Sequence, residues 1–152
     1  MNIYLAGPLF TQADRDFLES CAVSLESRGI ACFVPHRIQF ATLDPETVYA
    51  EDGAGVRNAT AMVAWLDGPV IDDGTACEIG IFAELCRREP DRHLGIVGLV
   101  TDWRTMRRKE AGTVGDGLNL FVAGAIRAHG EIVHSVDGVI ETLTRWRTDR
   151  GR

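Results

Sequence analysis

The stretch Val63-Ala-Trp-Leu-Asp-Gly-Pro-Val-Ile-Asp-Asp-Gly-Thr-Ala-Cys-Glu78-Ile-Gly80 is the part of the chain around which the rest is interpreted. A short apolar run at residues 62–66 has the length of a buried strand. A turn rich in Gly, Pro and Asp follows, and residues 75–78 then lead into the apolar spacing of a helix. In an open α/β sheet such a loop lies at the carboxyl ends of the strands, where ligands bind.

Carboxylates are concentrated in this segment. Asp67, Asp72 and Asp73 lie in the loop, and we expect Glu78 in the first turn of the helix. Acids that converge raise each other's pKa, so that one holds a proton while another stays charged. Cleavage at an anomeric carbon needs one ionised and one protonated acid. The carboxylate stabilises or traps the oxocarbenium-like centre, and the protonated acid assists the leaving group.

Plainer interpretations of the same residues stay open. Thr75-x-x-Glu78 is also a capping box, in which Glu78 only binds the Thr75 amide. Asp72 and Asp73 are typical turn formers. The roles can coexist, because a helix N-terminus stabilises an ionised carboxylate by ~0.3–1 kcal/mol, and an ionised carboxylate can act as a nucleophile.

Strand and helix signals alternate along the whole chain. We expect strands at residues 2–6, 30–34, 62–66, 94–100 and 131–133. We expect helices from the Thr11 capping box to Gly29, over 45–61 with an interruption at 52–55, from Thr75 onward, and over 118–129 and 136–147. The polar segment 101–117 predicts a lid or mobile loop.

This alternation predicts one domain over residues 1–152 with a three-layer, flavodoxin-like (Rossmann-like) α/β fold. Its five-stranded parallel sheet is flanked by helices, and its crevice lies where the first and third strands diverge.

Composition excludes several classes of function. A net charge of −6 argues against a nucleic-acid surface, and we interpret the basic stretches 104–109 and 145–152 as solvated faces. Neither a leader nor an apolar run of membrane-spanning length is seen, which indicates a cytoplasmic protein with no membrane partner. P-loop, Gly-x-Gly-x-x-Gly and zinc-ligand spacings are missing, so we expect neither a cofactor nor a metal.

Four motifs in order carry a family resemblance: Tyr4-Leu-Ala-Gly-Pro-Leu-Phe10, Asp67-Gly-Pro with Asp72-Asp-Gly-Thr-Ala-Cys-Glu-Ile-Gly80, Thr101-Asp-Trp-Arg104, and Leu118-Asn-Leu-Phe121. Together they resemble the nucleoside 2-deoxyribosyltransferase family. The resemblance implies exchange of nucleobases on 2′-deoxyribonucleosides in two displacement steps, without a cofactor and with small-molecule nucleosides and nucleobases as the only partners besides other copies of the chain.

The resemblance also assigns roles. Glu78 is the implied nucleophile, Tyr4 orients it, Asp72 helps to protonate the departing base, and Asp52 is a second acid beside the base. Asn119 is implied to hold a sugar hydroxyl from a neighbouring subunit, which implies a homo-oligomer between a dimer and a hexamer.

Further implied substrate contacts are Gly7, Phe10, His36, Gln39 and Phe121. Tyr4 can also be an ordinary strand aromatic, Asn119 an N-cap, Phe10 a core residue, and His36 and Gln39 loop residues.

Two other functions fit the same residues. If water takes the place of the second base in the second step, the protein is an N-glycosidase of nucleosides or their 5′-monophosphates. If the crevice binds nucleotides but catalyses no reaction, the protein is a nucleotide-binding module. The tail ends Thr-Asp-Arg-Gly-Arg152, unlike family members that close the site with an aromatic residue or a carboxylate there, and the basic loop 104–117 could engage a nucleotide phosphate.

Overall fold

The computed structural model describes residues 1–102 and 117–150. Its elements in chain order are β1 (Asn2–Ala6), α1 (Gln12–Glu26), β2 (Ala31–Phe33), the 3-10 helix η1 (Pro35–Arg37), α2 (Pro45–Asn58), β3 (Ala61–Trp65), α3 (Asp73–Arg88), β4 (Ile96–Leu99), α4 (Leu120–His129), β5 (Gly130–Val133) and α5 (Val136–Arg150). The strands form one parallel sheet in the order β2-β1-β3-β4-β5. The predicted five-stranded, flavodoxin-like α/β fold is confirmed.

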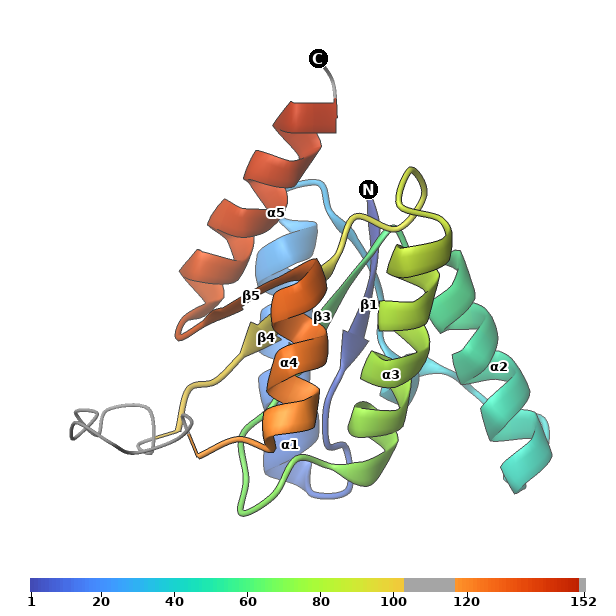
Figure 1. Cartoon of the computed structure of the whole chain (residues 1–152). Helices are drawn as coiled ribbons and strands as arrows, with labels where there is room; N and C mark the ends of the chain where they lie inside the picture. Colours follow the sequence, from blue (N-terminus) through green and yellow to red (C-terminus); the bar gives the residue numbers. More distant parts are fainter. Residues whose placement is uncertain (103–116, 151–152) are drawn as a thin grey trace.

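Helices cover both faces of the sheet, which gives three layers. Helices α1 and α5 pack on one face, while α2, α3 and α4 pack on the other (Figure 1). Because side chains alternate along a strand, Ile3 and Leu5 of β1 enter the first core and Tyr4 and Ala6 enter the second. The alternation thus places the Tyr4 side chain on the α2–α3 side of the sheet.

The chain changes direction across the sheet at β1. From β1 it passes through α1 to β2 on one side, and then through α2 to β3 on the other side of β1. A crevice is expected outside the carboxyl ends of β1 and β3, where these crossovers part. The predicted location of the crevice therefore matches the observed topology.

The ends of α1 follow the predicted sequence signals. The Thr11 hydroxyl accepts the Asp14 amide and the Asp14 side chain accepts the Thr11 amide, which completes the capping box. Gly29, with φ of 72°, follows the helix in the left-handed region that glycine tolerates.

Three predicted boundaries were wrong. Helix α2 runs without interruption through residues 52–55. Gly53 and Gly55 are both buried, and the tertiary packing of Gly55 against Phe33 outweighs the low helix propensity of glycine. Helix α3 begins at Asp73 rather than near Thr75, and α4 begins at Leu120 rather than at residue 118. The predicted lid falls mostly on residues 103–116, and the final two residues of the basic tail are 151–152; both segments lie outside the described residues.

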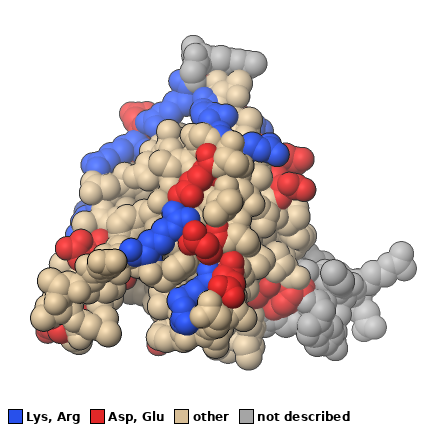
Figure 2. Space-filling view, turned by 180° about the vertical axis from the view of Figure 1, so that it is seen from behind, with Lys and Arg blue, Asp and Glu red and all other residues tan. Residues whose placement is uncertain are grey.

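The face formed by α1 and α5 carries charges of both signs. Figure 2 shows Lys and Arg gathered toward the end of the chain and mixed with Asp and Glu below. Arg145 pairs with Glu131, and the Arg147 guanidinium donates to the carbonyl of Arg28. Across residues 1–102 and 117–150, none of the helices has the length and apolar character needed to cross a membrane.

Candidate active site

A tyrosine and a glutamate from different elements meet beside the sheet. The Tyr4 hydroxyl, from β1, donates to Glu78 Oε1, from α3, over 2.5 Å. Tyr4 is fully buried and Glu78 is partly buried. A short bond from a neutral phenol to a carboxylate is a strong, charge-assisted hydrogen bond that fixes both side chains.

The predicted capping box between Thr75 and Glu78 is wrong. Asp72 is the N-cap of α3, and its Oδ2 accepts both the Thr75 amide and the Thr75 hydroxyl over 2.9 Å. Glu78 consequently lies in the second turn of the helix rather than the first. Its carboxylate is free of capping and is available to Tyr4, and the helix N-terminus is too distant to keep it ionised.

Burial sets the charge state of this pair. Burial raises the pKa of Glu78, and the carboxylates of Asp52 and Asp72 add to this effect. The hydrogen bond from Tyr4 lowers the pKa, and the net result is a pKa of about 7. Burial, the Glu78 carboxylate and Asp52 raise the pKa of Tyr4 far above its ordinary value, so Tyr4 stays a neutral donor. Glu78 is therefore poised between its protonated and ionised forms near neutral pH.

Asp52 is the second acid near the pair. It projects from α2, and burial followed by the charge of Glu51 raises its pKa. Its Oδ1 is buried and has no hydrogen-bond partner among the residues that the structure describes. A buried oxygen without a hydrogen-bond partner is rare in folded proteins, so this oxygen stands out among the polar atoms of α2.

The other two loop carboxylates have structural roles. Asp67 binds the end of β4, where its Oδ1 accepts the Thr101 amide over 2.6 Å and its Oδ2 accepts the Thr101 hydroxyl over 2.5 Å. Asp73 is exposed and accepts the amide of Gly74. The expected convergence of Asp67 and Asp73 on Glu78 is therefore wrong, and Asp52 from a different helix belongs to the group instead.

Asn119 and Phe121 lie at the start of α4. The Asn119 side chain accepts the amides of Phe121 and Val122, so its interpretation as an N-cap is confirmed. The Phe121 side chain is 85% exposed. In a single copy of the chain both residues are exposed, and their predicted contacts with substrate stay predictions.

The loop after β1 carries Gly7 and Phe10. Phe10 is 77% exposed, so its interpretation as a core residue is wrong. The Arg15 guanidinium fixes the loop by donating to the carbonyls of Leu9 and Phe10 over 2.8 and 3.0 Å. A Cβ at Gly7 would lie 3.0 Å from the Leu18 side chain, which gives this glycine a packing role.

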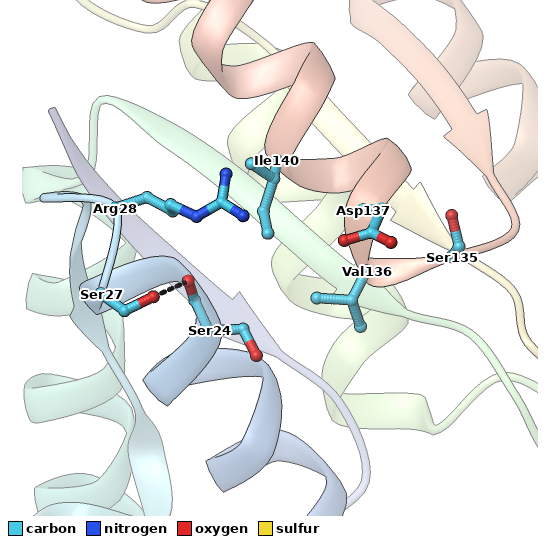
Figure 3. A pocket seen from close by; sticks show the side chains of 7 residues that line it. All are labelled: Ser24, Ser27, Arg28, Ser135, Val136, Asp137 and Ile140. Carbon is cyan, nitrogen blue, oxygen red and sulfur yellow. Dashed lines mark hydrogen bonds between the residues drawn. The ribbon is translucent and has the colours of Figure 1, made fainter.

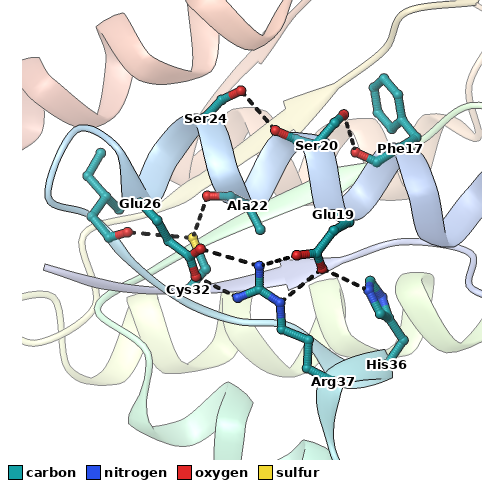
Figure 4. A network of polar contacts seen from close by, with 10 residues as sticks. Phe17, Glu19, Ser20, Ala22, Ser24, Glu26, Cys32, His36 and Arg37 are labelled. Atoms are coloured by element: carbon teal, nitrogen blue, oxygen red, sulfur yellow. Dashed lines mark hydrogen bonds and ion pairs between the residues drawn. The ribbon is translucent and has the colours of Figure 1, made fainter.

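His36 and Gln39 follow β2 as predicted, but His36 contacts α1. Its Nε2 lies 3.2 Å from Glu19, whose other oxygen binds Arg37, and Glu26 completes this network (Figure 4). Gln39 is exposed in the loop that follows η1. His36 therefore lies in η1 rather than in a loop, whereas the loop interpretation holds for Gln39. A contact of either residue with a base stays a prediction.

Two hollows lie in different parts of the molecule, and one of them is lined by the candidate site residue Asn119. One of about 350 Å³ lies between the β3–α3 loop and the start of α4, and its lining includes Ala76 and Asn119. The other, of about 280 Å³, lies between the end of α1 and the start of α5, where Arg28 and Asp137 face each other across it (Figure 3). Within the described ranges, His, Cys, Asp and Glu side chains form no cluster of three suited to a metal ion.

Residues 3–142 match the family model described as Nucleoside 2-deoxyribosyltransferase. The chain belongs to the nucleoside 2-deoxyribosyltransferase family. Tyr4, Asp52, Asp72, Glu78 and Asn119 all lie within the matched range. No curated protein matches the chain.

Solved structures share the deoxyribosyltransferase fold. A conserved protein from Enterococcus faecalis V583 is 27% identical, with a TM-score of 0.76 over 95% of this chain and 98% of that one. The 2-deoxyribosyltransferase from Bacillus psychrosaccharolyticus is 18% identical, with a TM-score of 0.65 over 92% and 90% of the two chains. The 2-desoxiribosyltransferase from Leishmania mexicana is 18% identical, with a TM-score of 0.58 over 80% and 84%.

Sequence reasoning missed Phe33, which contacts Tyr4. Its ring stacks on Tyr4 with centroids 5.2 Å apart and an interplanar angle of 18°. The two residues are register partners on neighbouring strands. Their apolar character was visible in the sequence, but nothing in it specified the register between β1 and β2.

Proposed function

We propose that this protein exchanges the nucleobase of 2′-deoxyribonucleosides through a covalent glycosyl-Glu78 intermediate. The observation that carries the proposal is the hydrogen bond from buried Tyr4 to Glu78, beside the paired strands β1 and β3, at whose carboxyl ends the fold is expected to bind ligands. A carboxylate oriented by a fixed donor has the geometry of a nucleophile in covalent catalysis. Family membership supports the same reaction class.

The reaction consists of two displacements at one carbon. In the first, a Glu78 oxygen bonds to C1′ as the C1′–N bond breaks, and the bonding electrons leave with the base, which takes up a proton. In the second, a nitrogen of another base attacks C1′, the C1′–O bond to Glu78 breaks, and the incoming base loses a proton. Glu78 must be ionised at the start, which its pKa of about 7 permits in half of the molecules at neutral pH.

Asp52 is a better donor of the proton to the departing base than Asp72. The Oδ2 of Asp72 is occupied by the amide and hydroxyl of Thr75. Asp52 has a raised pKa and a buried oxygen that has no hydrogen-bond partner among the described residues. A raised pKa moves a carboxyl group toward the pH range in which it can donate a proton in general acid catalysis.

Free nucleosides fit this site better than 5′-monophosphates. Helix N-termini are the usual sites for a phosphate, and α1, α3 and α4 begin toward the carboxyl edge of the sheet (Figure 1). Each already holds a side chain of the chain itself, from Thr11, Asp72 or Asn119. A phosphate there would have to displace these caps and approach the carboxylates around Glu78.

A second copy of the chain completes the site in this proposal. Large apolar side chains are exposed on segments near the carboxyl edge: Phe10, Val70, Leu120 and Phe121. Exposed apolar groups that gather in one region mark an interaction surface. Asn119 lies beside two of them, so a neighbouring subunit that covers them can bring its own Asn119 to the sugar.

A base-exchange assay tests the function. The protein is incubated with one deoxynucleoside and a different free base, and the products are separated by chromatography. A new nucleoside supports transfer, whereas release of free sugar alone makes the protein an N-glycosidase. Offering the 5′-monophosphate as donor in parallel tests the preference for nucleosides.

Two variants on one helix control this assay. Glu78→Gln keeps an oxygen that accepts from Tyr4, so the fold is retained while exchange and hydrolysis are lost. Glu84→Gln changes a half-exposed glutamate of α3 that, within the described part of the chain, forms ion pairs with Arg87 and Arg88 of the same helix, and it keeps full activity. Turnover by Glu78→Gln at more than a small fraction of the original rate contradicts the covalent route, and ligand binding without turnover by the unaltered protein makes it a binding module.

A further inference from the structure

We infer that Phe33 is a positioning residue, whose ring, packed against the bare Cα of Gly55, holds Tyr4 where its hydroxyl reaches Glu78. The inference rests on the proposed function for its catalytic meaning. Its geometry is independent of that function.

The ring of Phe33 limits the movement of Tyr4. The two rings are stacked at 18° with centroids 5.2 Å apart, and Tyr4 and Phe33 are paired in the β1–β2 register. The Tyr4 hydroxyl spans the distance to α3 to reach Glu78. A tilt of the ring would displace the hydroxyl, which lies at the far end of the side chain, more than any other atom of Tyr4.

Gly55 provides the space that Phe33 occupies. A Cβ at this position of α2 would lie 2.6 Å from both Cε1 and Cζ of Phe33 and 2.8 Å from Cδ1. Side chains do not approach so closely, so any other residue at position 55 would displace either the ring or the helix. The glycine was expected to interrupt the helix, and its contact with Phe33 explains why a residue of low helix propensity stands there.

The same contact sets the position of Asp52. Residues three apart lie on the same side of a helix, so Asp52 and Gly55 both face the sheet. The charge of Asp52 acts on both Tyr4 and Glu78. An outward shift of α2 would therefore withdraw Asp52 from the pair as well as release Phe33.

Three groups govern the proton on Glu78: Tyr4 from β1, Asp52 from α2 and Asp72 at the start of α3. The Tyr4 bond favours the ionised form, and the two carboxylates favour the protonated form. Loss of the Tyr4 bond raises the pKa of Glu78, and retreat of Asp52 lowers it. Replacing Phe33 alone leaves α2 in place, so it isolates the effect on Tyr4.

The test is a titration of Glu78 in the full-length protein by carbon NMR of labelled glutamate, with Glu78→Gln used to assign the signal. Phe33→Leu and Phe33→Met both remove the stacked ring and keep an apolar side chain. In either variant the pKa of Glu78 rises toward its value in Tyr4→Phe, which sets the upper limit. Below that pKa, kcat/KM falls about tenfold for each unit of the rise, because the ionised fraction falls in proportion.

Gly55→Ala tests the second half of the inference. In the original background it lowers kcat/KM, whereas in Phe33→Leu, which lacks Cε1 and Cζ, the added methyl group costs much less. Gly53→Ala is the matched control on the same helix, because its Cβ would meet only the flexible guanidinium of Arg57 at 3.0 Å. It leaves kcat/KM and the titration of Glu78 unchanged.

An unchanged pKa of Glu78 in Phe33→Leu or Phe33→Met overturns the inference, even when activity falls. Equal losses from Gly55→Ala in both backgrounds overturn the link between Gly55 and Phe33. Absence of base exchange by the unaltered protein refutes the proposed function instead, and the NMR titration then still decides whether Phe33 positions Tyr4.

Discussion

Replacing Tyr4 with phenylalanine removes one oxygen atom and with it the 2.5 Å hydrogen bond to Glu78 Oε1. The ring of Tyr4 and its stacking on Phe33 are kept. Because the lost bond lowers the pKa of Glu78, its removal leaves burial and the charges of Asp52 and Asp72 unopposed. The carboxyl group then holds its proton to a higher pH.

The size of the shift follows from the strength of the bond. A hydrogen bond to a charged acceptor contributes about 1.5–3 kcal/mol, and one pKa unit corresponds to about 1.4 kcal/mol. The pKa of Glu78 therefore rises by about one to two units from its original value of about 7. At pH 7 the ionised fraction, and with it kcat/KM, falls about 5- to 50-fold, whereas at pH 9 the loss is about twofold or less.

The assay measures kcat/KM for base exchange from about pH 5 to about pH 10, a range that covers both the protonated and the ionised form of Glu78. The ionisation of Tyr4 does not interfere, because burial and Glu78 raise its pKa far above the ordinary value. The variant should recover most of its activity as the pH rises. A loss of equal size at pH 6 and pH 9 would show that the hydroxyl does not control the ionisation of Glu78, and the reasoning would be refuted.

Two other substitutions have consequences that can be measured apart from the reaction. The pKa of Glu78 is about 7 in the folded chain, against its ordinary value of 4.5 in the unfolded chain, so the folded chain binds this proton more tightly. The free energy of unfolding therefore falls as the pH rises from 4.5 through 7. Glu78→Gln should therefore raise the free energy of unfolding at pH 8 by up to about 3 kcal/mol and change it little at pH 4; chemical denaturation at the two pH values checks this, and an equal effect at both would contradict it. Asp72→Ala should cost about 0.5–2 kcal/mol of stability through loss of the α3 cap, while Asp72→Asn keeps the cap. Denaturation and base exchange measured together decide the role of Asp72, because a stable Asp72→Asn without exchange would make Asp72, rather than Asp52, the proton donor.

The architecture was predictable because strand and helix signals alternate along the chain. The residues after the third strand were expected at the carboxyl edge of a parallel sheet, and the loop from the end of β3 to the start of α3 lies there. The capping box of α1 was also visible, since Thr11 and Asp14 act within four residues of one another. Local patterns of this kind do not depend on the rest of the fold.

The contacts around Glu78 depend on tertiary structure and were harder to predict. Both Thr75 and Asp72 can cap a helix, and spacing alone does not decide between them; the structure selects Asp72, which releases Glu78. Asp52 was identified through the family resemblance, and only the fold brings α2 close enough for its charge to act on Glu78. Gly55 led to the wrong prediction of an interrupted helix, because the sequence does not show that it packs against Phe33 on another element.

Mass spectrometry of the trapped intermediate tests the central claim most directly. The protein is mixed with a deoxynucleoside alone, quenched in acid and digested, and the peptides are searched for an added deoxyribosyl group. The account predicts that group on Glu78, and its disappearance when a second base is added before the quench. A sugar attached to any other residue, or base exchange that proceeds with no glycosylated peptide at any time, would contradict it.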